Sequence, residues 1–509
     1  MAETIAVIGA GIGGLSVAAR LAAAGYEVHV FEKQSGPGGK AFSETNGGYR
    51  FDTGPSLMTL REAFSQFFEE TDRRMEDYLD LEPLKPVCNY FYPDGTRLST
   101  FQDRDRLAAE FERVFGEAPE HIHAYLDDCS RVGEIASPFF LWKSPHERST
   151  FRGRQFWSSL FRLSRIHSMT TLDRVNRRAF RSPKLHQLFN RYATYNGSSP
   201  YRTPGTMVIV PHAEYNLGAF SVAGGIYAIP RAFEAVSREH GVTFHYDTLV
   251  DSIVTTPGGG RGRNGGAVSG IEVGGVFRPF DVVISNADVL VTYEKLLRDT
   301  RSPRYRRYRR MEPSSSVIVY FWGVRRTFPE LDQHNIFFSD DYAREFREIF
   351  DEHRAPEDPT IYVNITSKTT PGDAPEGGEN WFVLVNAPYD SGQDWESEAA
   401  RTRTTVISRL NAELGVDLEN LIEVESRLVP TDIEARTESY RGALYGIALN
   451  SPTAAFRRHP NRCRRYPGLF FVGGSAHPGG GMPLVTLSGK ITADLVREYY
   501  PLTGRPSAE

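Results

Sequence analysis

A pattern of strand, glycine-rich turn, helix and second strand fills residues 4–40, and it constrains the fold more than any other feature of the chain. The turn carries three glycines in the spacing GxGxxG, namely Gly9, Gly11 and Gly14. Gly9 permits a tight turn out of the strand, Gly11 lets the backbone approach a pyrophosphate, and Gly14 lets the helix pack against the sheet. The N-terminus of a helix also carries partial positive charge that favours phosphate. These features predict a βαβ unit that binds a dinucleotide, with an ordinary buried βαβ unit as the alternative.

The first GxGxxG is followed by an acidic residue at the end of the second strand, and a second GxGxxG in the chain is not. Glu32 ends the second strand, eighteen residues after Gly14, where a carboxylate can accept hydrogen bonds from an adenosine ribose. The glycines Gly260, Gly262 and Gly265 repeat the spacing, but no helical pattern follows them and no acid ends a second strand. We therefore interpret the second match as a hairpin loop.

Two further turns extend the predicted cofactor site. Gly38, Gly39 and Lys40 form a second glycine turn with a basic side chain suited to phosphate, and Lys33 directly follows the acid. Together with the fingerprint, this turn is typical of the larger FAD-binding oxidoreductases rather than of nicotinamide dehydrogenases. A later turn could line a flavin with free backbone amides, and it contains Gly54, Pro55 and Ser56.

The C-terminal block, residues 468–496, is the second strong signal. An apolar strand leads into Gly473 and Gly474, a proline-glycine turn follows, and a helix begins near Met482. Such a glycine-lined turn suits closure over an isoalloxazine ring. The helix N-terminus could stabilise negative charge on a reduced flavin.

Bulk properties narrow the class of protein. The length of 509 residues gives a soft expectation of about three domains. A net charge of −5 argues against nucleic acid as the main partner. Three scattered cysteines form neither a metal pattern nor a disulfide framework, which fits a reducing compartment: Cys88, Cys129 and Cys463. No signal peptide or membrane span is expected, so we predict a cytoplasmic protein without a metal.

One region favours the membrane surface. Between Pro138 and Ile166, Trp and Phe residues alternate with basic ones, and no acid occurs after Phe151. This composition suits a bilayer interface, and the alternative is an amphipathic core helix with a solvated basic face. A basic run at residues 301–310 is interpreted as a solvated helix face, with lipid headgroup contact as the alternative.

Taken together, the motifs resemble the bacterial and fungal carotenoid desaturases of the phytoene-desaturase type. The resemblance runs through nearly the whole chain and is carried by six blocks: residues 7–40, FDTGPS at 51–56, YNGSSPY at 195–201, GGIY at 224–227, SNAD at 285–288 and FVGGSAHPGGGMP at 471–483. The HPGGG turn, with residues 445–461 before it, is more similar to hydroxycarotenoid 3,4-desaturases. Phytoene-acting members often have a shorter turn that contains alanine.

The resemblance implies an α/β fold with non-covalent FAD. A Rossmann-type FAD-binding domain would be assembled from residues 1–85, 215–290 and 441–509. Residues 86–214 would form a substrate and membrane-associating region with a helical, membrane-facing part, and residues 291–440 a mixed α+β substrate domain. By match to the family, Val250 joins the glycines, Glu32, Lys40 and Met482 in contacting the cofactor.

The implied reaction removes hydrogen from a linear polyene by hydride transfer to the flavin and loss of a proton. Candidate substrates are phytoene, neurosporene or a 1-hydroxycarotenoid, and quinone or oxygen would accept the electrons. The sequence identifies no catalytic residue, and Asp52 is the one acid considered as a base. The alternatives are an FAD amine oxidase, a carotenoid isomerase or oxygenase of the same family, and a non-catalytic isoprenoid-binding protein on the same fold.

Overall fold

The computed structural model describes residues 4–147, 150, 166–256 and 265–502. The acid-free part of the basic aromatic segment, residues 151–165, lies outside these ranges. Gly260 and Gly262 of the second glycine match also lie outside them. On either side of that loop, β11 (Ser252–Thr255) and β12 (Val268–Val273) pair antiparallel, and no helix follows Gly265.

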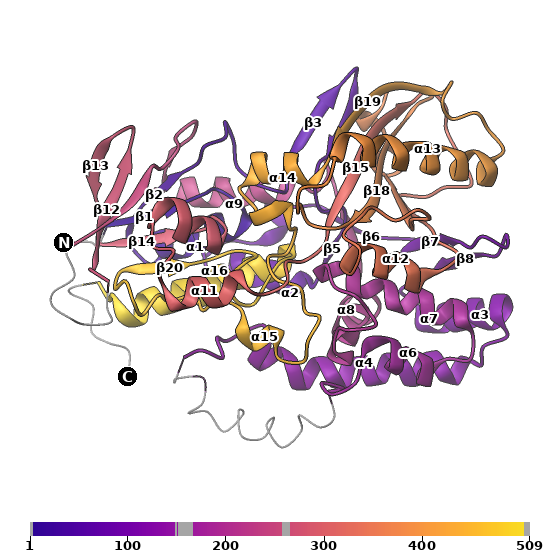
Figure 1. The fold of residues 1–509 in the computed structure, drawn as a ribbon, viewed down its shortest axis with the longest axis horizontal. Helices are drawn as coiled ribbons and strands as arrows, with labels where there is room; N and C mark the ends of the chain where they lie inside the picture. The colour runs from indigo at the N-terminus through magenta and orange to yellow at the C-terminus, as the bar shows by residue number, and fades with distance from the viewer. Residues whose placement is uncertain (1–3, 148–149, 151–165, 257–264, 503–509) are drawn as a thin grey trace.

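A five-stranded parallel sheet forms the first half of the molecule (Figure 1). Its strands come from both ends and the middle of the chain, in the order β10 (Thr243–His245), β2 (Glu27–Phe31), β1 (Thr4–Ile8), β14 (Val282–Ser285) and β20 (Leu469–Phe471). All neighbours are parallel, and Ile5 lies opposite both Val28 and Val282. The α/β fold expected from the sequence is confirmed, whereas the segment boundaries stay predictions.

Successive side chains of the central strand β1 point into two different cores, one on each face of this sheet. Ile5 and Val7 point into a core with helices α1 (Ile12–Ala23), α2 (Arg61–Glu69), α9 (Ala228–Glu239) and α16 (Met482–Tyr499). Ala6 and Ile8 point into a second core, which contains Ile271 of the antiparallel sheet β11–β12–β13 (Val276–Pro279). Because strand side chains alternate in direction, both faces are buried, as parallel sheets require.

A seven-stranded mixed sheet forms the other half. Its order is β19 (Ile422–Leu428), β15 (Ser316–Val324), β18 (Glu379–Ala387), β17 (Ile361–Ile365), β16 (His334–Phe337), β7 (Cys88–Phe91) and β8 (Arg97–Thr100). The pair β16–β7 is parallel and the others are antiparallel. Helix α13 (Trp395–Leu414) covers one face, where Val406 and Leu410 pack on Trp322 (Figure 1).

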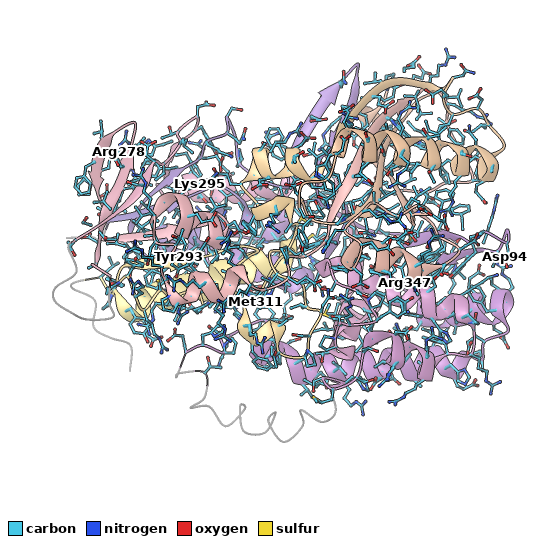
Figure 2. All side chains as sticks on the ribbon, in the orientation of Figure 1. Asp94, Arg278, Tyr293, Lys295, Met311 and Arg347 are labelled. Atoms are coloured by element: carbon cyan, nitrogen blue, oxygen red, sulfur yellow. The ribbon has the colours of Figure 1, made fainter. Side chains whose placement is uncertain are left out.

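Helices α3 (Arg104–Phe115), α4 (Pro119–Phe140), α6 (Leu172–Ala179) and α7 (Pro183–Asn190) lie below this sheet (Figure 1). Their shared core includes Phe111, Leu126 and Phe189. Asp94, at the far end of this region (Figure 2), pairs with Lys184 of α7. Among the helices that the structure describes, none has the length and apolar character needed to cross a bilayer. That this region faces a membrane stays a prediction.

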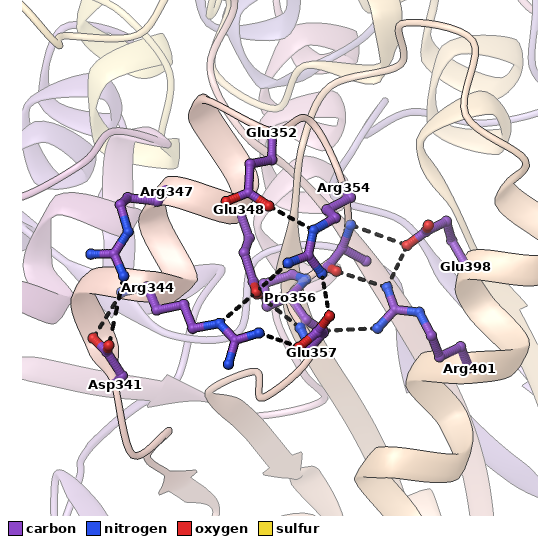
Figure 3. Close-up of polar contacts among 11 residues, drawn as sticks. Asp341, Arg344, Arg347, Glu348, Glu352, Arg354, Pro356, Glu357, Glu398 and Arg401 are labelled. Atoms are coloured by element: carbon purple, nitrogen blue, oxygen red, sulfur yellow. Dashed lines mark hydrogen bonds and ion pairs between the residues drawn. The ribbon is translucent and has the colours of Figure 1, made fainter.

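An ion-pair cluster joins three elements of the second half (Figure 3). The Glu348 carboxylate of α12 (Tyr342–Phe350) accepts from Arg344 Nε at 2.9 Å and Arg354 Nη2 at 2.6 Å. It also accepts from the Glu357 backbone N–H at 2.9 Å, and Arg401 of α13 reaches the same loop through the Ala355 carbonyl. These contacts hold α12 and α13 against the loop before β17.

Candidate functional site

One long cavity of about 1360 Å³ runs through both halves of the molecule. Its wall begins at the glycines of the first fingerprint and continues along the seven-stranded sheet to Met169 and Leu217 of the helical region. Pockets for one small ligand usually hold about 300–1,000 Å³. The cavity therefore has room for a cofactor and a second molecule.

The first fingerprint forms one end of this cavity. Gly9 adopts φ +98°, which turns the chain out of β1, and Gly11 is the N-cap of α1 without a side-chain cap. The unpaired backbone N–H groups of the first helical turn thus border the cavity, as anion binding requires. Gly14 does not line the cavity. A Cβ there would lie 2.1 Å from the Gly9 carbonyl oxygen, so Gly14 allows helix α1 to pack closely on the turn.

Glu32 is fixed at the end of β2. Its Oε2 accepts from the Ala10 backbone N–H at 2.7 Å, and its Oε1 accepts from the Gln34 N–H at 2.9 Å. Burial raises the pKa of Glu32, while these backbone hydrogen bonds act in the opposite direction. The neighbouring Lys33 also lines the cavity, and its Nζ donates to the Ala435 carbonyl at 3.1 Å.

The second glycine turn packs directly against the first. The Gly38 N–H donates to the Ala10 carbonyl at 2.9 Å, and a Cβ on Gly39 would lie 3.3 Å from the Gly11 Cα. Both glycines have positive φ, +119° and +61°. This close approach brings the two glycine turns together at one end of the cavity.

Lys40 joins the fingerprint to the C-terminal segment. Its Nζ donates to the Leu444 carbonyl at 2.7 Å and to the Ala443 carbonyl at 3.3 Å. Burial lowers the pKa of Lys40 to about 8, and the nearby Asp288 carboxylate opposes that shift. Burial likewise raises the pKa of Asp288 to about 6. Lys40 lines the cavity, and the Leu444 and Ala443 carbonyls engage two of the three ammonium donors; a direct contact with phosphate stays a prediction.

Gly54, Pro55 and Ser56 line the cavity between its two halves. A Cβ on Gly54 would lie 2.0 Å from the Lys40 carbonyl oxygen, so this turn and the second glycine turn touch. Ser56 Oγ accepts from the Tyr362 hydroxyl at 2.6 Å.

Asp52, the acid considered as a base, is not part of the cavity wall. Its Oδ1 accepts from Arg50 Nη2 at 2.7 Å, and its Oδ2 accepts from the Ile226 N–H at 2.9 Å. Burial raises the pKa of Asp52, with Arg50 acting against the shift. These contacts tie the FDTGPS segment to the GGIY segment, which is a structural role.

The C-terminal block forms the wall opposite the fingerprint. Gly473, Gly474 and Met482 line the cavity together with Val250. Helix α16 begins at Met482 after Gly481, which has φ +106° and provides no side-chain cap. The N-terminal ends of α1 and α16 therefore border the same cavity.

Asn286 links the two walls, and sequence reasoning did not single it out. Its Nδ2 donates to the Gly9 carbonyl at 3.3 Å, and a Cβ on Gly473 would lie 2.5 Å from its Oδ1. Asn286 could have been found from its place in the SNAD segment, at the carboxyl end of a central parallel strand. In such sheets this end of the strands borders the ligand crevice.

A group of buried and half-buried polar side chains in the deep part of the cavity was also missed: Arg191, Tyr195, Glu214, His334 and Tyr362. Arg191 and Tyr195 share one short helix (Arg191–Asn196), whereas Glu214, His334 and Tyr362 come from three other elements, so no sequence spacing could have assembled the whole group.

These residues fit a flavin dinucleotide. The two glycine turns pack so closely that a Cβ on Gly11 or Gly38 would lie 2.8 or 2.1 Å from protein atoms. Glu32 is held at the end of β2 on the cavity wall, where a carboxylate can accept from an adenosine ribose, and two helix N-termini offer positive ends. Val250, Gly473 and Gly474 supply the second wall. Within the described ranges, no cluster of His, Cys, Asp or Glu side chains is arranged to hold a metal ion.

Comparison with known proteins agrees with this site. A family profile described as flavin containing amine oxidoreductase matches residues 12–497. The chain is 41% identical over 490 residues to a 1-hydroxycarotenoid 3,4-desaturase from Flavobacterium sp. (strain P99-3), covering 96% of this chain and 98% of that protein. It is 33% identical over 497 residues to a 4,4'-diapolycopene oxygenase from Methylomonas sp, covering 97% and 98%.

Solved structures share the fold. An oxidoreductase from Methanosarcina mazei aligns with a TM-score of 0.61 at 15% identity, covering 96% of this chain and all of that one. Putrescine oxidase bound to putrescine aligns with a TM-score of 0.60 at 14% identity, covering 97% and 99%. At these identities the likeness concerns the fold alone.

Proposed function

The chain belongs to the flavin-containing amine oxidoreductase family and uses FAD, and we propose that it desaturates a linear hydroxylated carotenoid. The resemblance to carotenoid desaturases predicted from the motifs is confirmed by relatives that align over nearly the full length of the chain. The relative with 41% identity is a 1-hydroxycarotenoid 3,4-desaturase, which supports desaturation of a polyene that carries a hydroxyl group on carbon 1.

The observation that carries the proposal is the shape of the cavity. From the glycine walls it continues past Val317, Ile336 and Leu384 of the seven-stranded sheet to Ile166 and Val210 of the helical region. A small amine needs only a compact pocket beside the cofactor. A long, mostly apolar channel instead matches an extended polyene.

When bound, FAD supplies the electron-accepting chemistry of the reaction. The residues of this chain bind and orient both molecules. Glu32 and the backbone donors of α1 would hold the ADP half, and the Ser56 turn and Gly473 line the same cavity. The apolar channel excludes water and aligns the carbon–carbon bond that loses hydrogen. Conjugation in the polyene stabilises developing positive charge, so the reaction places little demand on protein acid–base groups.

Entry of the substrate from a membrane surface is part of the proposal. Met169 and Leu217 line the cavity while 87% and 44% exposed, and Phe456 does so while 49% exposed. Large exposed apolar side chains at a cavity mouth suit contact with lipid. In a flotation assay the protein should rise with anionic vesicles, and recovery of all protein in the soluble fraction would contradict peripheral attachment. Quinone or oxygen would then reoxidise the cofactor.

Oxygenation of a polyene is the second candidate, because relatives at 33% and 32% identity are carotenoid oxygenases. The higher identity to the desaturase favours desaturation. Amine oxidation rests on fold likeness alone. A non-catalytic role is disfavoured by the intact glycine turns and Glu32.

A chromatographic assay tests the function. Flavin-loaded protein is incubated with liposomes that contain phytoene, neurosporene or a 1-hydroxycarotenoid, with quinone or oxygen as acceptor. We expect the 1-hydroxycarotenoid to gain one conjugated double bond. Incorporation of oxygen without a new double bond would replace the proposal with oxygenation, and no product from any polyene would contradict it.

A further inference from the structure

An apolar polyene does not account for the polar side chains in the deep part of the cavity. Among the residues that the structure describes, five side chains that line the cavity keep a buried atom without a hydrogen-bond partner, namely Arg191 Nε, Asn196 Oδ1, His334 Nε2, the Tyr342 hydroxyl and His477 Nδ1. A buried polar atom without a partner is costly, so a ligand group that pairs with one of them would bind more tightly. These atoms are the candidate contacts for a polar group of the substrate.

The charged pair in this region is satisfied internally. The Glu214 carboxylate accepts from the Tyr192 hydroxyl at 2.6 Å and from the Tyr195 hydroxyl at 2.7 Å. Arg191 Nη2 donates to the Tyr90 hydroxyl at 2.8 Å and lies 3.6 Å from Glu214 Oε1. Arg191 retains only a free donor, and an ether oxygen would satisfy that donor as well as an alcohol would.

His334 offers a free acceptor. The Tyr362 hydroxyl donates its one proton to Ser56 Oγ, so its oxygen accepts from His334 Nδ1 at 2.7 Å. Nδ1 therefore carries the ring proton. Burial, with the nearby Arg191 charge, lowers the pKa of His334 to about 3. The ring is neutral at neutral pH, and Nε2 keeps a lone pair that can accept a hydrogen bond.

The relay places this acceptor beside the predicted flavin wall. Ser56 belongs to the turn that closes against Lys40, and Tyr362 connects it to His334. In a 1-hydroxycarotenoid only carbon 2 separates the carbon that bears the hydroxyl from the C3–C4 bond. A hydroxyl contact must therefore lie close to the bond that is oxidised, and His334 meets that requirement.

We propose that His334 Nε2 accepts a hydrogen bond from the substrate's tertiary hydroxyl and so selects hydroxylated polyenes and sets which bond is presented. This inference rests on the proposed desaturase function. His334 acts on specificity, and the Tyr362–Ser56 relay holds its ring in the accepting tautomer. The apolar remainder of the chain then extends past Ile336 towards the cavity mouth.

Three matched polyenes separate the possible contacts: a 1-hydroxy compound, its 1-methoxy ether and the compound with hydrogen at carbon 1. The wild-type protein should prefer the hydroxy compound over both others by about tenfold to a hundredfold in kcat/KM, because only an alcohol can donate to Nε2. Equal turnover of ether and alcohol would show that no acceptor on the protein distinguishes the hydroxyl group, and it would overturn the inference.

Variants of His334 test whether this residue causes the preference. His334→Phe should bring the ratio of kcat/KM for the hydroxy compound over the other two close to one, by slowing the hydroxy compound. His334→Gln keeps an acceptor and should retain part of the preference. Val276→Ala, at an exposed position outside the cavity wall, should leave the ratio as in the wild type. A preference that survives in His334→Phe, or that disappears in Asn196→Ala or Tyr342→Phe instead, would overturn the inference. Flavin absorbance and melting temperature of each variant verify that cofactor and fold are retained.

Binding of the desaturated products gives a second readout without turnover. Their visible absorbance should shift on binding, and the hydroxy product should bind more tightly than its methyl ether in the wild type but not in His334→Phe. If the wild type converts none of the three polyenes, the proposed desaturase function fails. Product binding then still reports whether His334 selects the hydroxyl group.

Discussion

Asn286 donates from Nδ2 to the main-chain carbonyl of Gly9 at 3.3 Å, and this contact joins the fingerprint to the end of β14. The same amide lies where a Cβ on Gly11 or Gly473 would need space, 2.8 Å from Nδ2 and 2.5 Å from Oδ1. The two walls of the cofactor site, more than four hundred residues apart in sequence, thus pack against one side chain. The amide fixes the width of the site.

Asn286→Ala should weaken FAD binding about tenfold, since the Gly9 carbonyl loses a partner and the two walls lose their spacer. The measurement is the dissociation constant for FAD, by titration of the apoprotein with flavin absorbance as the readout. Asn46→Ala, at an exposed position of the β3 (Ser43–Asn46) hairpin, is the control. Equal affinity in the two variants would show that Asn286 does not shape the site.

Glu32→Gln should weaken FAD binding about tenfold to a hundredfold. An amide cannot accept from both the Ala10 and Gln34 N–H groups with the strength of a carboxylate, and it offers less to a ribose hydroxyl. Glu27→Gln, an exposed position on the same strand, should bind FAD as the wild type does. Unchanged affinity in Glu32→Gln would remove Glu32 from the cofactor site.

The sequence predicted the nucleotide half well because its features are local. Gly9, Glu32 and Met482 owe their positions to a turn, a strand end and a helix start, and each leaves a short pattern in the chain. Lys40 shows the limit of such reasoning. Its place after two glycines predicts a phosphate contact, which stays a prediction, but it gives no sign that the ammonium also donates to the carbonyl of Leu444, a residue that only the folded chain brings near.

The deep part of the cavity could not have been predicted. His334 and Tyr362 lie on neighbouring strands of the seven-stranded sheet, and Ser56 comes from the other half of the chain. A lone histidine in an apolar strand is usually structural, and only the sheet register shows that this one reaches a cavity with an unpaired nitrogen.

Glu345 should make stability depend on pH. Burial raises the pKa of Glu345 to about 7 from an unfolded value near 4.5, although Thr360 and Ser339 donate to the carboxylate. The folded chain therefore binds more protons than the unfolded chain between these values. Its free energy of unfolding should fall as pH rises from about 4.5 to 7.

Glu345→Gln keeps the shape and removes the titration. The variant should lack this fall, so at pH 8 it should be more stable than the wild type by about 3 kcal/mol. Urea unfolding at several pH values between 5 and 8 measures the difference. Parallel pH profiles for the two proteins would contradict the shifted pKa.

The cluster around Glu348 should contribute to stability (Figure 3). The side chain of Glu348 is 1% exposed and accepts from two arginines and a backbone N–H, so Glu348→Ala leaves those donors facing a gap. We expect a loss of about 2 kcal/mol in the free energy of unfolding by urea titration. Glu352→Ala, whose side chain is 49% exposed, should cost less than about 0.5 kcal/mol. If both variants lose the same free energy of unfolding, the burial of Glu348 adds nothing to the stability that this cluster provides.

The most direct test of the central claim is a single turnover without oxygen. Protein loaded with oxidised FAD is mixed with one equivalent of a 1-hydroxycarotenoid in detergent or liposomes, and the flavin and polyene spectra are recorded together. The account predicts that the flavin bleaches while one new conjugated double bond forms for each flavin reduced. A flavin that stays oxidised, with the polyene unchanged, would contradict it.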